Sequence, residues 1–378
     1  MSLDPNRPDL TIGVLGTGAM GRGIAQVAAA GGIHVLMMDA RAGAAQEALD
    51  FIGKMLQRAA EKGSMTHLDA QAAAGRIKIV NALTDFKPCH VLIEAVAENL
   101  DVKRQVFGEL EAIVAPDCIL VTNTSSLSVT TVAARLKTPQ RFAGFHFFNP
   151  VPLMRLVEVI SGLQTEEWVC EALVAIGKRM TREPVRCTDA PGFLVNQVGR
   201  GFTLEASHLV YEGISSFVDV DRVMRDVGGF RMGPFELMEL TGLDVTQPAS
   251  VLIYDQFFQE PRYRPNLIMQ ARYEAGVLGR KTKRGFYNYD AEMKAIVPPE
   301  APAPGARPDS VWVSPAEPYG CKALTALLEK IGAPLESGAK PGAKALCLVT
   351  PIGDDATTCA MEQGLDPKRT VAVDALFP

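Results

Sequence analysis

The sequence predicts an α/β domain built on a parallel sheet, followed by an all-α domain and a small α/β unit at the C-terminal end. Three observations support this prediction. Short apolar runs alternate with helical patterns from residue 11 to about 190, the order typical of a parallel sheet. From residue 191 to about 290 the pattern is helical only, and short apolar runs return after residue 310.

Seven segments of the first part are expected to be strands, because each is a short apolar run between turn or helix signals. They are Thr11–Leu15, His34–Met38, Ile77–Val80, Val91–Val96, Ile119–Thr122, Arg141–Phe147 and Arg155–Ile160. Between the second and third strands lies a long stretch, residues 42–76, rich in Ala, Gln, Glu and Lys. Its length and the breaks at Gly63 and Ser64 predict a helical hairpin inserted into the sheet domain.

The helical part begins after Pro191, with apolar residues at helical spacing over residues 193–211. Asp219 or Asp221 is expected to cap the next helix, Gly233-Pro234 to open a third, and residues 266–275 to form another. This pattern predicts an all-α domain over residues 191–290.

The last part of the chain begins with a linker rich in proline and alanine, over residues 297–308. Three apolar runs after it are expected to be strands and two segments between them helices. The strands are Val311–Ser314, Ala345–Thr350 and Thr370–Asp374, and the helices are Cys321–Ile331 and Asp355–Gln363. The predicted domains are therefore 1–190, 191–290, a linker over 291–309 and a βαβαβ unit over 310–378.

Composition excludes several classes of protein. Hydrophobic residues make up 47% of the 378 residues, charged residues 21%, and the formal net charge is −5. Neither a nucleic-acid surface nor a polybasic membrane patch is expected from this balance. No stretch has the roughly 18 consecutive apolar residues of a membrane helix, and the first ten residues lack the apolar core of a signal peptide. The seven scattered cysteines form no C-x-x-C pair, so we expect neither a metal site nor a disulfide framework, and a cytoplasmic location.

A glycine-rich motif follows the first strand. Gly16, Gly18 and Gly21 form G-x-G-x-x-G at the start of a helix, which is suited to a pyrophosphate at the helix N-terminus. Asp39 ends the second strand, where a carboxylate binds the adenosine ribose hydroxyls. The full context predicts a Rossmann-type dinucleotide site. Asp39 would repel a 2′-phosphate, which favours NAD over NADP, although Arg41 lies two residues further on.

Polar residues follow three later strands, at the sheet edge where open α/β folds bind ligands. They are Glu98 and Lys103 after the fourth strand, residues 123–126 after the fifth, and Asn149 after the sixth. Each also has an ordinary interpretation, because Asn-Thr-Ser-Ser can be a helix cap and Glu98 with Lys103 a solvated surface pair.

His146 lies among phenylalanines on the sixth strand, where a lone histidine is more often a core residue. Glu158 favours a different interpretation. Strand alternation places this carboxylate on an apolar face, where it requires a hydrogen-bonded partner, and His146 lies on the preceding strand. A carboxylate that holds one imidazole nitrogen leaves the other free as a general base. The remaining histidines have no comparable acidic neighbour.

Together these residues resemble the L-3-hydroxyacyl-CoA dehydrogenase family over about residues 11–290. The resemblance rests on IGVLGTGAMGRGIA from Ile12, VAENLDVKRQVF from Val96, TNTSSL from Thr122, RFAGFHFFNPVPLMRLVEV from Arg141, DAPGFLVNQ from Asp189, MGPFELMELTGLDV from Met232 and GRKTKRGFYNY from Gly279. The segment after the linker is similar to longer bacterial members of the 3-hydroxybutyryl-CoA and phenylacetate-pathway type.

The resemblance implies a role for each matching residue. It implies that NAD is bound by Gly16, Gly18, Ala19, Met20, Gly21, Asp39, Glu98, Lys103, Asn123, Ser125 and Asn149. It implies catalytic roles for His146 as general base, Glu158 as its orienting carboxylate, Ser125 at the reacting oxygen and Asn196 near the thioester. Ser125, His146, Asn196 and Lys62 would contact the acyl-coenzyme A substrate, Lys62 at the coenzyme A phosphates. The sequence departs from the family at Gln197, where Arg is usual, and at Met55, where some members have a small polar residue.

The expected function is therefore NAD-dependent oxidation of L-3-hydroxyacyl-CoA, or the reverse reduction. A short acyl chain such as 3-hydroxybutyryl, a role in fatty-acid or aromatic-acid degradation, and a homodimer are expected with it. Two alternatives stay open: a dehydrogenase of a free hydroxy acid or sugar acid, and a catalytically inactive NAD-binding scaffold. Lys62 argues against the first alternative, and the set Ser125, His146, Glu158 and Asn196 argues against the second.

Overall fold

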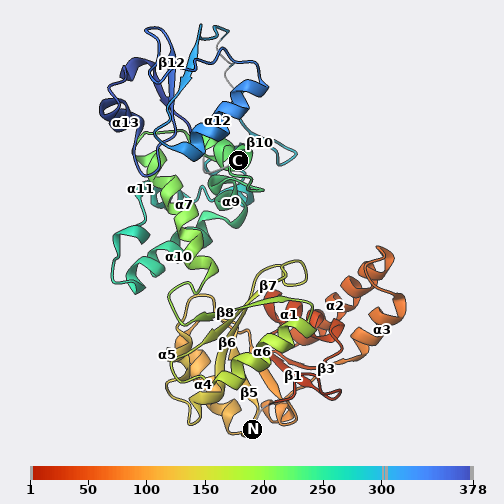
Figure 1. Cartoon of the computed structure of the whole chain (residues 1–378). Helices are drawn as coiled ribbons and strands as arrows, with labels where there is room; N and C mark the ends of the chain where they lie inside the picture. The colour runs from red at the N-terminus through yellow and green to blue at the C-terminus, as the bar shows by residue number, and fades with distance from the viewer. Residues whose placement is uncertain (1–2, 300–301, 303–304, 375–378) are drawn as a thin grey trace. The chain divides into compact units, whose positions relative to one another are not determined.

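The computed structural model describes residues 3–299, 302 and 305–374, and its helices and strands are labelled in Figure 1. The chain divides into two compact units. The first consists of Met1–Ile214 with Thr241–Leu278, and the second of Ser215–Leu240 with Gly279–Pro378. Helices of the predicted all-α domain therefore lie in both units. The predicted domain boundaries remain a proposal.

The first unit contains an eight-stranded sheet. Its strands are β1 (Thr11–Leu15), β2 (His34–Met38), β3 (Ile77–Ile79), β4 (Val91–Glu94), β5 (Ile119–Thr122), β6 (Phe142–Phe147), β7 (Leu156–Ser161) and β8 (Glu183–Thr188). The order across the sheet is β3-β2-β1-β4-β5-β6-β7-β8. The strand order reverses between β1 and β4, which is where folds of this type bind a ligand at the carboxyl ends of the strands.

The sheet differs from the predicted one in two respects. All neighbouring strands are parallel except β6 and β7, which are antiparallel with His146 directly opposite Glu158. The eighth strand, β8, was not predicted. Its sequence, EPVRCT, contains Pro184 and polar residues in place of an apolar run, and it lies at the sheet edge, where proline is tolerated.

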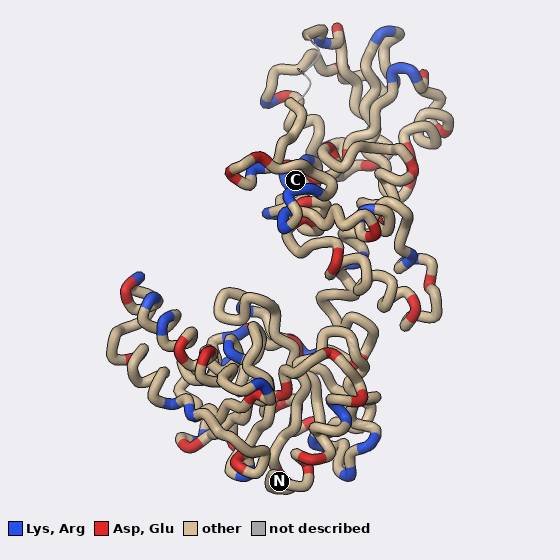
Figure 2. Tube along the Cα trace, turned by 180° about the vertical axis from the view of Figure 1, so that it is seen from behind, with Lys and Arg blue, Asp and Glu red and all other residues tan. Residues whose placement is uncertain are grey.

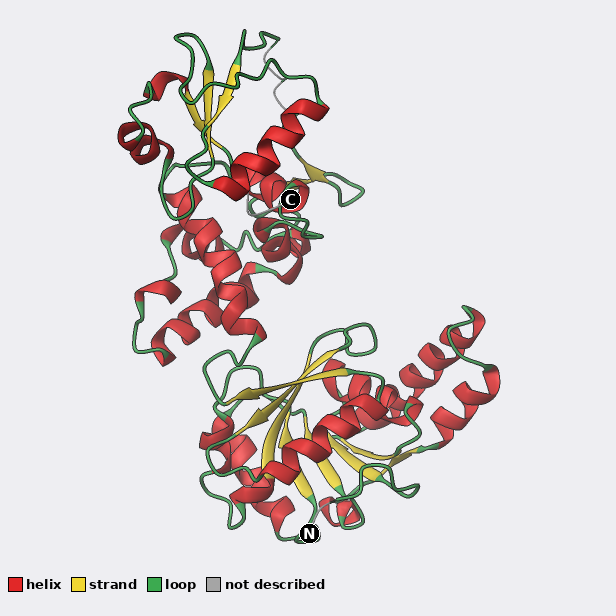
Figure 3. Ribbon diagram, in the orientation of Figure 1, coloured by secondary structure: helices red, strands yellow, loops and turns green. Residues whose placement is uncertain are grey.

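Helices cover both faces of this sheet (Figure 3). On one face, α1 (Ala19–Ala30), α2 (Ala44–Glu61), α3 (His67–Gly75) and α6 (Glu167–Arg179) share one buried apolar cluster with the strands. On the other face, α4 (Leu100–Glu111) and α5 (Val129–Ala133) share a second cluster. The alternation of side chains along each strand explains the two clusters: Ile93 belongs to the first and Leu92 to the second.

The predicted helical hairpin is confirmed. It consists of α2 and α3, and the chain turns between them at Gly63, which has a φ of 74°. The hydroxyl of Thr66 caps α3 by accepting a hydrogen bond from the backbone N–H of Asp69. Buried residues of the first apolar cluster, among them Ile52 and Leu56, attach α2 to the sheet domain.

The remaining helices of the first unit are α7 (Val195–Tyr211), α10 (Leu243–Gln256) and α11 (Leu267–Glu274). The second unit contains α8 (Phe217–Asp226) and all but the last residue of α9 (Pro234–Thr241). Neither predicted cap of α8 is correct, because Ser216 caps this helix through its hydroxyl. Asp219 lies in the first turn, and Asp221 is buried and accepts the backbone N–H groups of Phe235 and Glu236 at the start of α9.

The second unit also contains the predicted βαβαβ arrangement. Its parallel strands are β11 (Val311–Val313), β12 (Leu346–Val349) and β13 (Thr370–Ala372), and its helices are α12 (Pro318–Lys330) and α13 (Ala356–Glu362). Strands β9 (Asn288–Tyr289) and β10 (Ala295–Ile296) form a short antiparallel pair. Part of the predicted linker, residues 300–301 and 303–304, lies outside the described residues. Short 3-10 helices occur at Leu83–Phe86, Pro139–Arg141, Pro261–Tyr263, Arg280–Thr282 and Pro367–Arg369.

Candidate active site

The glycine motif forms a tight turn between β1 and α1. Gly16 has a φ of 93°, and a Cβ on it would lie 2.5 Å from the carbonyl oxygen of Ala95. A Cβ on Gly21 would lie 1.8 Å from the carbonyl oxygen of Gly16, so the start of α1 can approach the turn only if residue 21 is glycine. A Cβ on Gly18 would meet nothing within 4 Å, which leaves open space in front of the helix N-terminus. The first N–H groups of a helix have no partner within it. Residues 18–21 therefore fit a pyrophosphate.

Asp39 lies at the end of β2, beside this turn. Its carboxylate accepts hydrogen bonds from the backbone N–H of Thr17 at 2.7 Å, the Thr17 hydroxyl at 2.9 Å and the backbone N–H of Arg41 at 2.9 Å. Burial raises the pKa of Asp39, but these hydrogen bonds outweigh burial and lower it overall. The Arg41 side chain turns away and pairs with Glu47 at 2.6 Å. A carboxylate with a lowered pKa thus stands beside the glycine turn, and Arg41 is already paired with Glu47.

Lys103 is not part of a solvated surface pair. Its side chain is 1% exposed, and its Nζ lies 2.6 Å from Glu94 Oε1 and 3.2 Å from Glu98 Oε2. Glu94 ends β4, is fully buried, and accepts further hydrogen bonds from the Val96 N–H and the Thr122 hydroxyl. Glu94 therefore joins β4, β5 and α4 at the carboxyl edge of the sheet. Sequence reasoning missed this residue, although a carboxylate that ends an apolar strand was a usable signal.

Glu98 organises the loop that carries Ser125. Its Oε1 accepts hydrogen bonds from the Thr124 hydroxyl at 2.5 Å and the backbone N–H groups of Ser125 and Ser126 at 3.0 and 3.1 Å. Burial raises the pKa of Glu98, while the Thr124 hydroxyl and the positive charge of Lys103 outweigh it and lower the pKa overall. Asn123 accepts a hydrogen bond from the Phe147 N–H at 2.9 Å, which fixes the same loop to β6.

His146 and Glu158 form a buried pair. The distance from His146 Nδ1 to Glu158 Oε2 is 2.6 Å, and the two side chains are 6% and 0% exposed. The imidazole lies between the rings of Phe148 and Phe193, at centroid distances of 4.5 and 5.7 Å. In the tautomer whose Nδ1–H donates to Glu158, Nε2 carries the free lone pair of the imidazole. The two side chains are thus paired as predicted, and the arrangement suits a general base.

Glu158 also makes a second set of contacts that the sequence did not indicate. Its other oxygen, Oε1, accepts the backbone N–H groups of Leu194 and Val195, at 2.9 and 2.8 Å. These groups begin α7, so a carboxylate lies at the positive end of the helix dipole. Asn196 is the next residue of α7. The carboxylate that orients His146 therefore also fixes the backbone beside Asn196.

Several predicted residues carry free polar groups. The side chains of Ser125, Asn149 and Asn196 make no hydrogen bond among the described residues, and Ser125 and Asn149 are exposed. Gln256, at the end of α10, donates a hydrogen bond to the Ser126 carbonyl at 3.1 Å, which attaches this helix to the Ser125 loop. Gln197 donates to the Tyr263 hydroxyl at 3.1 Å, within the helical part of the unit.

Lys62 lies away from these residues, at the C-terminal end of α2. It is exposed, as are Lys54 and Arg58, and the spacing of four residues places the three cations along one face of the helix. None of the three pairs with an acidic side chain among the residues that the structure describes. Figure 2 shows the resulting row of basic residues on the hairpin. Met55 is partly buried beside this row.

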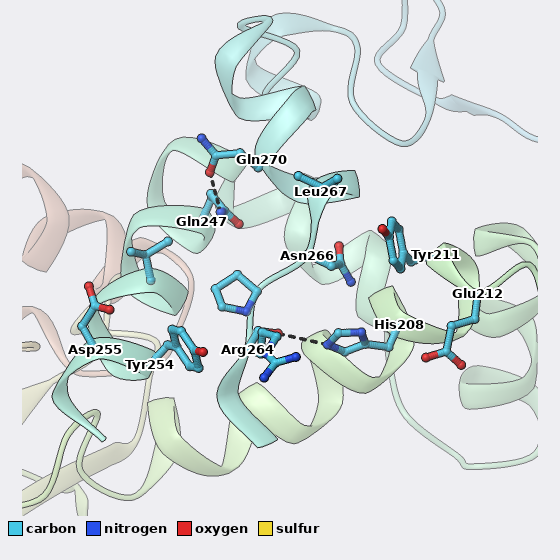
Figure 4. A pocket seen from close by; sticks show the side chains of 12 residues that line it. His208, Tyr211, Glu212, Gln247, Tyr254, Asp255, Arg264, Asn266, Leu267 and Gln270 are labelled. Atoms are coloured by element: carbon cyan, nitrogen blue, oxygen red, sulfur yellow. Dashed lines mark hydrogen bonds between the residues drawn. The ribbon is translucent and has the colours of Figure 1, made fainter. Parts of the chain in front are cut away.

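A separate pocket lies between α7, α10 and α11 (Figure 4). Its lining includes His208, which is hydrogen-bonded through Nε2 to the Arg264 carbonyl at 3.0 Å, and Gln247, which donates to Gln270 at 2.7 Å. No predicted site residue lines this pocket. It is therefore not the site that contains His146 and Glu158.

Within the described ranges, no group of three or more His, Cys, Asp and Glu side chains could hold a metal ion. No helix in those ranges has the length and hydropathy needed to cross a membrane. The seven cysteines are free thiols.

Comparison with known families gives two matches that together cover most of the chain. The model described as "3-hydroxyacyl-CoA dehydrogenase, NAD binding domain" matches residues 11–190, and that described as "3-hydroxyacyl-CoA dehydrogenase, C-terminal domain" matches residues 192–289.

Curated proteins with similar sequences carry related names. The chain is 40% identical over 291 residues to the 3-hydroxyadipyl-CoA dehydrogenase of Escherichia coli. The matched region covers 77% of this chain and 61% of that protein. The match thus spans less than two thirds of that relative. The chain is also 39% identical over 277 residues to a probable 3-hydroxybutyryl-CoA dehydrogenase of Bacillus subtilis. This matched region covers 73% of this chain and 96% of that protein.

Solved structures agree with these matches. The (S)-3-hydroxybutyryl-CoA dehydrogenase from Ralstonia eutropha superposes with a TM-score of 0.71 at 38% identity, over 74% of this chain and 99% of that one. A 3-hydroxybutyryl-CoA dehydrogenase from Escherichia coli superposes with a TM-score of 0.76 at 32% identity, over 98% of this chain and 81% of that one. The second likeness extends over the small βαβαβ unit.

Proposed function

Because the chain belongs to the 3-hydroxyacyl-CoA dehydrogenase family of NAD-dependent enzymes, we propose that it oxidises short L-3-hydroxyacyl-CoA thioesters to 3-oxoacyl-CoA, or catalyses the reverse reduction. One observation carries the proposal: the buried His146–Glu158 pair, 2.6 Å apart. Glu158 also fixes the start of the helix that carries Asn196, and Asn123 fixes the Ser125 loop to Phe147, the residue next to His146.

In the proposed oxidation, His146 Nε2 removes the proton of the substrate 3-hydroxyl. Glu158 holds the imidazole in the tautomer that makes this possible and stabilises the positive charge that then forms on it. The Ser125 hydroxyl hydrogen-bonds the reacting oxygen, and the Asn196 amide binds near the thioester. When bound, NAD supplies the acceptor for the hydride that leaves C3. In the reduction, the same imidazole returns the proton.

NAD would be held by the residues at the carboxyl edge of the sheet. Residues 18–21 offer free backbone N–H groups and open space for the pyrophosphate, and Asp39 offers a carboxylate for the adenosine ribose. Glu98, Lys103 and Asn149 would surround the nicotinamide ribose. The contribution of Lys103 to this site would be indirect. Its ion pairs with Glu94 and Glu98 hold its ammonium group in one position.

Coenzyme A would contact the hairpin. Three unpaired cations on one helix face, Lys54, Arg58 and Lys62, suit the phosphates of this cofactor, since each phosphate gains a charge-assisted hydrogen bond. Replacement of all three by Gln is expected to raise KM for acetoacetyl-CoA about tenfold at low salt, and less at high salt. The KM for NADH should be unchanged. Lys87→Gln, a change of an exposed lysine outside the hairpin, serves as the control.

The assay that tests the proposed function is the oxidation of NADH with acetoacetyl-CoA, compared with free acetoacetate. We expect turnover with the thioester and little with the free acid. A higher kcat/KM for the free acid would support a hydroxy-acid dehydrogenase, for which the unpaired cations of α2 have no obvious use. Binding of NADH without turnover of either compound would support an inactive scaffold.

A homodimer is a further part of the proposal. The helices of the first unit expose large apolar side chains, among them Val198 (67%), Val245 (57%) and Leu267 (65%), and twofold dimers are the commonest soluble assemblies. The apolar residues at helical spacing within residues 191–290 that we expect to supply this surface are Phe202, Leu209, Val210, Leu237, Leu240 and Leu243. Leu209 and Leu240 are exposed and Phe202, Val210 and Leu237 are partly buried, but the choice of Leu243 is wrong because it is fully buried. Light scattering at micromolar concentration should give twice the mass of the chain, and a monomer would contradict the dimer.

The acyl group, the pathway and the location are also proposals. The relatives are named for both a 3-hydroxybutyryl and a 3-hydroxyadipyl thioester, which favours short acyl chains in fatty-acid or aromatic-acid degradation. A cytoplasmic location accords with seven cysteines in the thiol form, which a reducing compartment maintains.

A further inference from the structure

Glu94 ends β4 beside the residues expected to bind NAD, although the sequence predicts no role for it. Its Oε1 accepts hydrogen bonds from Lys103 Nζ and the Val96 N–H, both at 2.6 Å, and its Oε2 accepts one from the Thr122 hydroxyl at 2.7 Å. The Thr122 oxygen itself accepts the Thr124 N–H at 3.3 Å. All the partners of Glu94 therefore donate to it, which is the environment of an ionised carboxylate.

The cluster formed by Glu94, Lys103 and Glu98 contains two carboxylates and one ammonium group. The ammonium nitrogen lies 2.6 Å from Glu94 Oε1 and 3.2 Å from Glu98 Oε2. Glu98 also has only donors as partners, because its Oε1 accepts hydroxyl and backbone N–H groups of residues 124–126. In the part of the chain that the structure describes, no second cation pairs with either carboxylate. One negative charge of the cluster is therefore not neutralised.

This negative charge lies near the proposed catalytic pair. In the sheet, Glu94 is paired with Thr122 of β5, and Thr122 with Gly144 of β6, the strand that carries His146. Neighbouring strands are about 4.8 Å apart, so about 10 Å separates Glu94 from β6. Because Glu94 is fully buried, salt screens its charge only weakly over this distance. Burial of a carboxylate on neutral partners is not by itself a sign of function, since Asp221 has such partners too. The position of the charge is what gives it a function.

We propose that this charge stabilises the cationic nicotinamide ring of NAD⁺ relative to the neutral ring of NADH, and that Glu94 thereby lowers the reduction potential of the bound cofactor. The inference rests on the proposed function, since it takes Glu98 and Lys103 to surround the nicotinamide ribose. In the oxidation, C3 of the substrate gives a hydride, two electrons and one proton, to the ring, and His146 takes the hydroxyl proton. The ring loses its positive charge in this step, so a fixed negative charge nearby favours the reverse reduction. Glu94 is fully buried and acts by charge, not by contact.

A purely structural role for Glu94, as the link between β4, β5 and α4, gives a different expectation. Loss of that link would weaken the binding of both forms of the cofactor alike, since NAD⁺ and NADH differ only in the nicotinamide ring. An electrostatic role changes the ratio of their two dissociation constants. Both constants are measured on one preparation, so the ratio does not depend on the fraction of protein that folds.

The experiment measures Kd for NADH by its fluorescence and Kd for NAD⁺ by displacement of NADH. In Glu94→Gln the cluster is neutral, and the ratio of the NAD⁺ constant to the NADH constant should rise about tenfold, the size expected for one charge at about 10 Å in a partly dry site. A tenfold rise corresponds to about 30 mV in the two-electron potential of the bound cofactor. Addition of Lys103→Met to Glu94→Gln restores the single net negative charge and should return the ratio towards that of the wild type.

Glu109→Gln is the matched control, because it makes the same substitution at an exposed residue of α4, about 9 Å along the helix from Lys103. Its ratio should equal that of the wild type. Glu98→Gln removes the same charge from the cluster, at a side chain that is partly exposed. This variant must therefore shift the ratio in the same direction, even if Glu94→Gln does not fold.

An unchanged ratio in Glu94→Gln or in Glu98→Gln, or a ratio that the added Lys103→Met does not return, would overturn the inference. Turnover of acetoacetyl-CoA with NADH by the wild type tests the proposed function separately. A protein that shows the shift in the ratio but no turnover would contradict the dehydrogenase assignment alone. An active enzyme whose ratio does not respond to these substitutions would contradict this inference alone.

Discussion

At the scale of single residues, Glu158 links two parts of the site. One oxygen orients His146, and the other accepts the N–H groups that begin α7. Period-two alternation was enough to predict the first contact, because a carboxylate on an apolar strand face must have a partner. The second could not be predicted, since it depends on where the chain turns after Ala190 and places the N-terminus of α7 against the sheet.

Substitution Glu158→Gln should separate these two contacts. The amide oxygen can still accept the N–H groups of Leu194 and Val195, while the amide nitrogen donates to His146 Nδ1 and leaves the proton on Nε2. That tautomer cannot act as a base, so we expect kcat to fall ~10²–10⁴-fold, the range for loss of a general base. The melting temperature should change by only a few degrees. Near-normal kcat would show that Glu158 does not set the tautomer.

Cofactor preference is a second property of single residues. The pKa of Asp39 is lowered beside the proposed ribose site, and Arg41 is held by Glu47. The kcat/KM for NADH should exceed that for NADPH by about tenfold or more, since a carboxylate repels the 2′-phosphate. Asp39→Ala should reduce this preference, and Arg41→Ala, the control, should leave it intact. A loss of preference in the Arg41 variant would assign the selection to that residue.

At the scale of elements, the sequence predicted most strands to within one or two residues, because buried parallel strands are continuous apolar runs. It failed at β8, whose polar residues are tolerated at an edge, and at α8, where Ser216 and not an aspartate is the cap. The sequence also does not indicate the buried position of Lys103, since its partner Glu94 lies within the longer predicted strand Val91–Val96. Each failure arises where tertiary contacts, and not local pattern, decide the structure.

The turn between β1 and α1 gives a matched pair of variants. A Cβ on Gly21 would lie 1.8 Å from the carbonyl oxygen of Gly16, and this clash can be relieved only if α1 moves away from the turn. Gly21→Ala should therefore lower the free energy of unfolding by more than about 1 kcal/mol, as well as weaken NADH binding. A Cβ at Gly18 meets nothing within 4 Å in the protein, so Gly18→Ala should keep the stability and weaken only NADH binding. Denaturant titration and NADH fluorescence measure the two properties, and equal stability losses would contradict the account.

At the scale of the whole molecule, the residues of the proposed site lie in the first unit. The glycine turn, the His146–Glu158 pair, the Ser125 loop and the row of cations on α2 all belong to it. The second unit contains the βαβαβ arrangement, whose strands carry no glycine-rich phosphate loop. Val313 is followed closely by Pro315 and Pro318, which have no N–H to offer an anion. We therefore expect this unit to act in stability and assembly.

The most direct test of the account compares the wild type with His146→Gln in the NADH-linked reduction of acetoacetyl-CoA, with NADH affinity measured on the same samples. We predict that the variant binds NADH as the wild type does and that its kcat is ~10²–10⁴-fold lower, because only the proton transfer is lost. A His146→Gln enzyme with near-normal kcat would contradict the account, since another group would then carry the proton.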